Sequence, residues 1–137
     1  MSSESTESGQ ATDGVLGSLD PDVAEVVRGY LVEPIASIDI LEDQVSLYAK
    51  ELESQADEGA VFDLEYAISL ARHCENLLAA ADSMSEEHRR LVQAAARYFC
   101  VSDDADGDTE SLIGFDDDGA LIEAVALAIG RGDLLED

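Results

Sequence analysis

Lysine is almost missing from this chain of 137 residues, since Lys50 is the only one. The 7 Lys plus Arg residues face 32 Asp plus Glu residues, which gives a formal net charge of −25. Proteins bind nucleic acids and anionic membranes through clusters of Lys and Arg that displace counterions from phosphates. The composition therefore argues against a nucleic acid or a membrane surface as the partner.

Long apolar runs and cysteines are scarce as well. No apolar run approaches the roughly 20 residues that span a bilayer, and no basic segment followed by an apolar stretch marks a signal peptide. The two cysteines, Cys74 and Cys100, fall within apolar helical patterns, which is typical of reduced, buried thiols. The spacing around them also lacks the paired cysteines of a zinc site. We expect a cytoplasmic protein.

The acidity itself has three interpretations. In a salt-adapted protein, carboxylates hold hydrated cations, and repulsion is screened because the Debye length is only about 3 Å at 1 M salt. An inhibitor that mimics nucleic acid is the second interpretation, and an ordinary acidic protein is the third. The near absence of lysine beside six arginines favours salt adaptation, because a mimic needs acid on only one face.

Apolar residues recur at spacings of three and four along most of the chain, and no alternation long enough for a strand appears. This pattern predicts an all-α fold, a bundle of about five helices. We expect residues 19–137 to form one domain and residues 1–18, rich in Ser and acid, to form a disordered tail. The expected helices cover, approximately, residues 20–33, 35–55, 61–81, 83–101 and 116–130.

The last of these helices is the most apolar, with only Glu123 interrupting its run. A helix that is apolar on all sides is normally buried, so we expect it to be central and largely buried, or covered by a second subunit. Asp20 before Pro21 marks the start of the first helix, and Ser83 with Glu86 predicts a capping box. Arg90 and Arg97 are seven residues apart, hence on one helical face, where we expect them to pair with carboxylates rather than to form an anion pocket.

An acidic segment, residues 102–115, separates the last two helices and is predicted to be a loop. With the acids after it, the segment supplies hard oxygen donors that suit Mg²⁺, Ca²⁺ or Mn²⁺. The spacing does not fit an EF-hand, because placing Gly107 sixth puts Ile113 where a glutamate is required. A structural role is the favoured alternative: loop aspartates bind backbone N–H groups, and later ones cap the last helix. The candidate metal ligands are Asp104, Asp108, Asp117 and Asp118.

The order of residues around this segment resembles the YkvA-like family of small helical proteins of unknown function. The shared pattern runs over residues 98–130 and consists of Tyr98-Phe99, Asp104, Asp108, Gly114-Phe115, Asp117-Asp118 and the apolar residues 120–122. The resemblance implies a helical fold in which these four aspartates occupy the aspartate positions of the family. The prolines of the family's loop are replaced here by Ser102, Gly107 and Ser111. The family has no established activity, so the resemblance implies no reaction.

We therefore expect a non-enzymatic helical protein that acts through contacts with another protein, or with a second copy of itself in a homodimer. No catalytic residue and no cofactor-binding residue is assigned. Two hypotheses of other classes stay open. One is a divalent-metal-dependent hydrolase that uses the four aspartates, and the other is the acidic mimic of nucleic acid.

Overall fold

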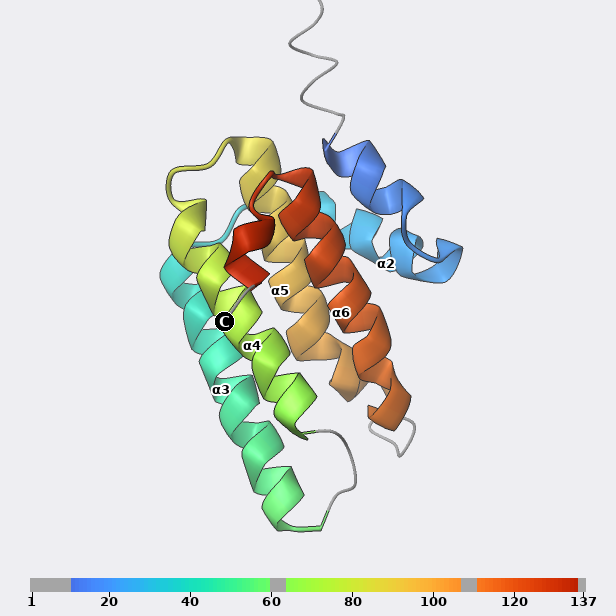
Figure 1. The fold of residues 1–137 in the computed structure, drawn as a ribbon, viewed down its shortest axis with the longest axis vertical. Coiled ribbons are helices and arrows are strands. Elements are labelled where there is room, and N and C mark those ends of the chain that lie inside the picture. The colour runs from blue at the N-terminus through green and yellow to red at the C-terminus, as the bar shows by residue number, and fades with distance from the viewer. Residues whose placement is uncertain (1–10, 60–63, 107–110, 136–137) are drawn as a thin grey trace, which may run out of the picture.

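The structure, a computed structural model, describes residues 11–59, 64–106 and 111–135, with the side chains of residues 101–116 left out of the description. The described residues form a packed bundle of six α-helices and contain no strand (Figure 1). The predicted all-α fold is confirmed. Within the same residues, none of the helices has the length and apolar content to span a membrane.

A first helix covers residues 11–17 and is followed by five longer helices and a short 3₁₀ helix. Figure 1 shows α3 to α6 side by side, with α2 at one end of the bundle. The elements are α2 (Pro21–Leu31), α3 (Ile38–Asp57), α4 (Leu64–Ala81), α5 (Glu86–Asp106), α6 (Ser111–Ala128) and η1 (Gly132–Leu135). Helix α5 packs against α2, α3, α4 and α6, so α5 is the central helix. The prediction that the last helix is central is therefore wrong.

The core follows the predicted helical spacing most closely on α3. Its buried side chains are Leu41, Val45, Tyr48 and Leu52, which recur every three or four residues as predicted. The ring of Tyr48 meets that of Phe99 on α5 edge to face, with centroids 5.0 Å apart. This aromatic contact fixes α3 against the central helix.

Helix α6 has one buried face among its described side chains. Leu121, Ile122, Val125 and Ala126 are almost completely buried, whereas Leu127 is 63% exposed. The predicted burial of this helix thus holds for one face, because α6 lies at the side of α5 and leaves its other face open.

The segment 11–17 departs from the predicted tail. Residues 1–10 lie outside the described residues, but residues 11–17 are helical and Val15 is completely buried. Glu87 at the start of α5 accepts hydrogen bonds from the backbone N–H and the hydroxyl of Thr12, at 3.0 and 2.8 Å. The first 18 residues are polar on average, so their composition does not reveal that Val15 and Leu16 pack against the core.

The termini of α5 and α6 also differ from the prediction. Ser85, not Ser83, caps α5 by accepting a hydrogen bond from the His88 backbone N–H. Helix α5 continues to Asp106 and α6 begins at Ser111, so most of the predicted acidic loop, residues 102–115, is helical. A glycine or aspartate costs a helix no more than about 1 kcal/mol, which is too little to end one that packs well.

Candidate functional site

The structure describes the side chains of two of the four predicted metal ligands, Asp117 and Asp118. Asp104 lies on the last turns of α5, where side chains are not described, and Asp108 lies outside the described residues. Asp117 and Asp118 are adjacent on α6, seven and eight positions into the chain segment that begins at Ser111. The prediction that they cap this helix is wrong, because α6 begins several residues earlier. Among described residues, no group of three or more His, Cys, Asp or Glu side chains is placed to hold a metal ion.

Asp117 and Asp118 lie in opposite environments. Asp117 is exposed, whereas Asp118 is 1% exposed and is one of two polar residues among the buried side chains that are described. Successive helical residues point about 100° apart, which explains how neighbours face solvent and interior. Asp118 therefore defines a buried acidic position on the inner face of α6.

Two thiols share the surroundings of Asp118, one from each neighbouring helix. Burial raises the pKa of Cys74 on α4 well above its ordinary value, and the proximity of Cys100 and Asp118 raises it further. Burial, reinforced by Asp118, also raises the pKa of Cys100 on α5 to about 12, although Arg97 acts in the opposite direction. Both thiols are therefore protonated near neutral pH, and a protonated thiol is a poor nucleophile.

A phenol completes this region. Burial raises the pKa of Tyr98 to about 12, and the nearby charges of Asp117 and Asp118 act in the same direction. We name Asp118, Cys74, Cys100 and Tyr98 the Asp118 cluster. It joins α4, α5 and α6, and the pKa values of its phenol and both thiols lie above their ordinary values, mainly because of burial.

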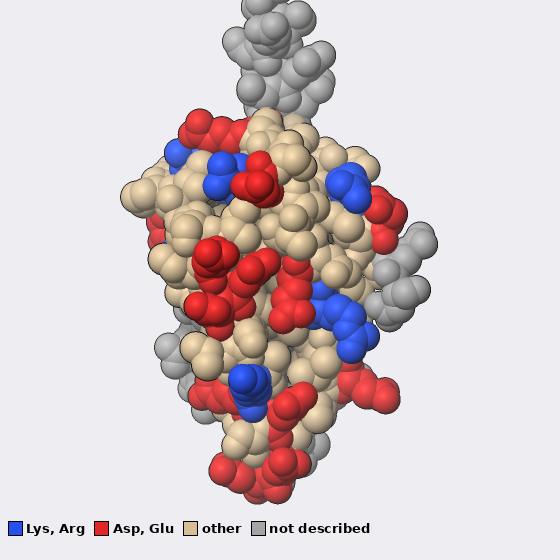
Figure 2. Space-filling view, turned by 90° about the vertical axis from the view of Figure 1, so that its left-hand side faces the viewer, with Lys and Arg blue, Asp and Glu red and all other residues tan. Residues whose placement is uncertain are grey.

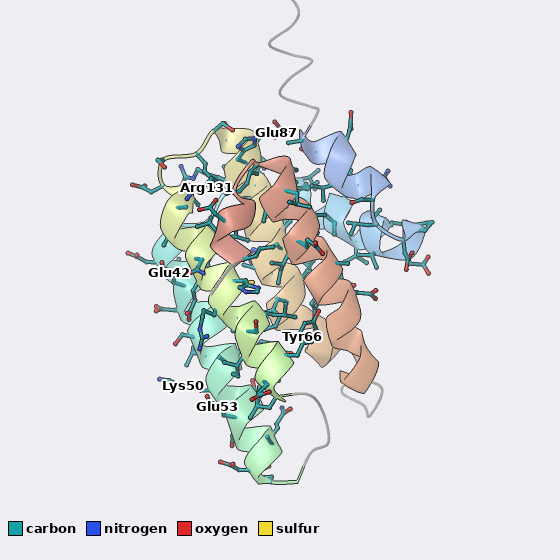
Figure 3. All side chains as sticks on the ribbon, viewed as in Figure 1. Glu42, Lys50, Glu53, Tyr66, Glu87 and Arg131 are labelled. Atoms are coloured by element: carbon teal, nitrogen blue, oxygen red, sulfur yellow. The ribbon has the colours of Figure 1, made fainter. Side chains whose placement is uncertain are left out.

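The glycine that follows Asp118 on α6 lies directly against the Tyr66 side chain of α4. A Cβ atom built on Gly119 would collide with the hydroxyl of Tyr66 and come within 3.1 Å of its ring carbon Cζ. Figure 3 shows Tyr66 projecting from α4 toward α6. The glycine thus provides the space into which the tyrosine packs, a close approach that its missing Cβ permits.

A polar stripe on α5 holds the connection between α2 and α3. Arg90 donates to the backbone carbonyls of Leu31 and Glu33, at 3.0 and 2.8 Å, and forms an ion pair with Glu86 at 3.1 Å. Arg97, seven residues later, lies 3.4 Å from the carboxylate of Glu33. The expected pairing of Arg90 and Arg97 with carboxylates is thereby confirmed.

Gln93, buried between these two arginines, was not predicted as a structural residue. Its side-chain carbonyl accepts from the Ala36 backbone N–H at 2.8 Å, and its amide donates to the Pro34 carbonyl at 3.0 Å. Its spacing of three and four residues from Arg90 and Arg97 was the available signal, because it puts all three on one helical face.

The outer side of α3 is the most distinctive exposed surface. The helix carries six carboxylates and a single basic residue, Lys50. Figure 2 shows carboxylates over this side of the molecule, with several Lys and Arg side chains among and beside them, and Figure 3 shows Glu42, Lys50 and Glu53 projecting outward.

Two large apolar side chains interrupt this acidic surface. Ile40 is 52% exposed and Leu47 is 66% exposed, and they lie two helical turns apart on one face. We name the exposed residues Ile40, Asp43, Gln44, Leu47 and Glu51 the α3 strip. The periodicity of the sequence predicts the buried residues of α3, but Ile40 and Leu47 fall outside that pattern.

Comparisons of the chain with protein-family models, with curated proteins and with solved structures find no match. The resemblance to the YkvA-like family accordingly depends on the motif residues of this sequence alone and stays a prediction.

Proposed function

We propose that this chain is a non-enzymatic helical protein that acts by binding another protein. The observation that carries the proposal is the α3 strip, where two large aliphatic side chains remain exposed within an otherwise charged helix face. Exposed apolar side chains that share one face and are rimmed by polar residues mark sites of protein contact, where their burial supplies binding free energy.

In this proposal the Asp118 cluster has a structural role and takes no part in binding. Its two thiols have raised pKa values, and its carboxylate is buried where the three helices meet. In the proposed function the cluster maintains the packing of α4, α5 and α6, and the outer surface carries the activity. The position of Asp117 and Asp118 in the motif also supports our proposal that the chain is a divergent, proline-poor relative of the YkvA-like family.

We further propose a cytoplasm of high salt as the setting, because a net charge of −25 is tolerated best where repulsion is screened within a few ångströms. The melting temperature then rises steeply with KCl up to molar concentrations. A flat response contradicts the salt-adaptation part of the proposal and leaves the binding part to be tested separately.

The partner is best captured by zero-length coupling of carboxylates to amines in extracts of the native host. Reagents that join two lysines are poorly suited because the chain has only Lys50, whereas its 32 acidic residues will couple to lysines of a bound protein. We expect discrete cross-linked products of higher mass. Phosphoester turnover that requires Mg²⁺ or Mn²⁺ and is lost in Asp117→Asn would overturn the proposal in favour of a hydrolase.

A further inference from the structure

We infer that the α3 strip binds a positively charged amphipathic helix of another protein, with Ile40 and Leu47 as the apolar contacts. This inference rests on the proposed function and adds the chemistry of the partner. It follows from the spacing, exposure and charge of residues on a single helix.

The spacing suits a helical partner. Ile40 and Leu47 are seven residues apart, which places them about 10 Å from each other along the axis at a rise of about 1.5 Å per residue. Apolar residues on the partner that are also seven positions apart match this distance when the two helices lie nearly parallel or antiparallel. A pair of such contacts is the minimum that fixes the register of one helix on another.

The carboxylates of the α3 strip favour a partner helix of positive charge. Asp43 lies three residues after Ile40 and four before Leu47, and Glu51 lies four residues after Leu47, so both carboxylates adjoin the apolar pair on the helix surface. Each aliphatic side chain therefore has a negative neighbour, and Lys50, three residues after Leu47, is the one basic residue beside the pair. A helix with Lys or Arg beside its apolar residues complements this arrangement, whereas an acidic helix brings like charges together.

A second copy of this chain is disfavoured as the occupant for the same reason. Two protomers that meet through the α3 strip would bring the carboxylates Asp43 and Glu51 of one strip against a second strip of the same sign at contact range. A C2 dimer apposes identical patches, so it cannot provide the opposite charge that the strip lacks.

High salt weakens the charged contacts of the α3 strip but not its apolar contacts. At molar KCl the charges act only at contact range, because the Debye length is about 3 Å, while burial of the aliphatic side chains keeps its effect. The carboxylates then set orientation and exclude acidic partners, and the apolar pair supplies most of the affinity.

The test uses the full-length chain and a synthetic amphipathic helix of about 14 residues, with leucines on one face and lysines on the other. Fluorescence anisotropy at 0.1 M and about 2 M KCl measures its affinity. We expect I40S/L47S to weaken binding at least about tenfold at both salt concentrations, as loss of a central apolar contact does. The matched control is Leu127→Ser, which removes an equally exposed leucine from α6 and should leave the affinity unchanged. Circular dichroism melts establish that both variants fold.

Three results would overturn the inference. The first is equal binding by the parent and I40S/L47S, which means that the peptide is held by general acidity. The second is equal binding of a peptide with the same lysines and with alanine in place of leucine. The third is a dimer of the chain alone, seen by sedimentation, that dissociates in I40S/L47S. If the peptide fails but host extracts yield a cross-linked protein joined elsewhere on the surface, the proposed function stands and only this inference falls.

Discussion

Carboxylates occupy two opposite environments in this protein, and the contrast separates its interior from its surface. On α3, six carboxylates line a helix whose outer side faces solvent. On α6, Asp118 is buried beside two thiols and a phenol whose pKa values are raised. Carboxylates thus contribute surface charge on α3, whereas on α6 the charge of Asp118 adds to burial in raising the pKa values of its neighbours.

The largest expected effect is a loss of stability in alkali that originates in the Asp118 cluster. The pKa of Cys100 is 9.0 in ordinary surroundings and about 12 in the folded protein. As the pH rises through 9, the thiol ionises in the unfolded chain but keeps its proton in the folded one. The unfolded state then binds fewer protons, so the free energy of unfolding decreases as the pH rises from about 9 toward 12. Tyr98 and Cys74 act in the same direction.

Urea unfolding at a series of pH values measures this effect, with Cys100→Ala as the test variant. The variant should show a smaller decrease between pH 9 and 12. An identical slope in the parent and the variant would show that Cys100 is not shielded from water.

Close packing beside Asp118 predicts the next largest effect. Gly119→Ala should lower the free energy of unfolding by up to about 2 kcal/mol, because overpacking costs about 1–3 kcal/mol and the higher helix propensity of alanine returns about 1. Gly29 on α2 is the matched control, since a Cβ there meets nothing within 4 Å. Gly29→Ala should stabilise the protein by about 0.5–1 kcal/mol. If Gly119→Ala no longer lowers the free energy of unfolding when Tyr66 is also replaced by alanine, the collision with Tyr66 is established.

The charge of Asp118 can be removed with little change of shape. Asp118→Asn should lower the pKa of Cys100 from about 12, although burial, the larger cause, keeps it above 9.0. The rate of alkylation of Cys100 as a function of pH, followed by mass spectrometry, reports this shift. Asp117→Asn is the control, because Asp117 is exposed and acts on Tyr98. A thiol titration that is the same in all three proteins would place Asp118 too far from Cys100 to matter.

The smallest effect belongs to α3. Glu51→Gln should change the free energy of unfolding by no more than about 0.5 kcal/mol, as substitutions of exposed residues usually do. Any gain comes from relief of repulsion and should shrink in molar KCl. Thermal melts at low and high salt decide this. A loss of several kcal/mol would mean that Glu51 has a structural partner, and the contrast between the carboxylates of α3 and Asp118 of α6 would then fail.

Sequence periodicity was sufficient for the helical class and for the buried stripe of α3, because burial there repeats with the helical period. Periodicity did not predict the features that depend on tertiary contacts. The prediction of a loop at residues 102–115 relied on local preference, which amounts to at most about 1 kcal/mol per residue. The central position of α5 depends on its partners, which composition does not encode.

The candidate site was only partly predictable for a related reason. The four aspartates were chosen for their chemistry, but the helical phase that buries Asp118 and exposes Asp117 depends on the neighbours of α6. Tyr66 and Gly119 come together from different helices, so no local spacing connects them. The exposed pair Ile40 and Leu47 could have been found by asking which apolar residues of α3 fall outside its buried stripe.

The hydrogen bonds between Gln93 and the α2–α3 connection should affect hydrogen exchange there. The Ala36 amide lies between helices, where exchange with deuterium is normally fast, yet it donates to a side chain that is 2% exposed. We expect this amide to exchange as slowly as those of the core helices and to lose that protection in Gln93→Ala. A single backbone proton would then report whether the N-terminal helices are docked.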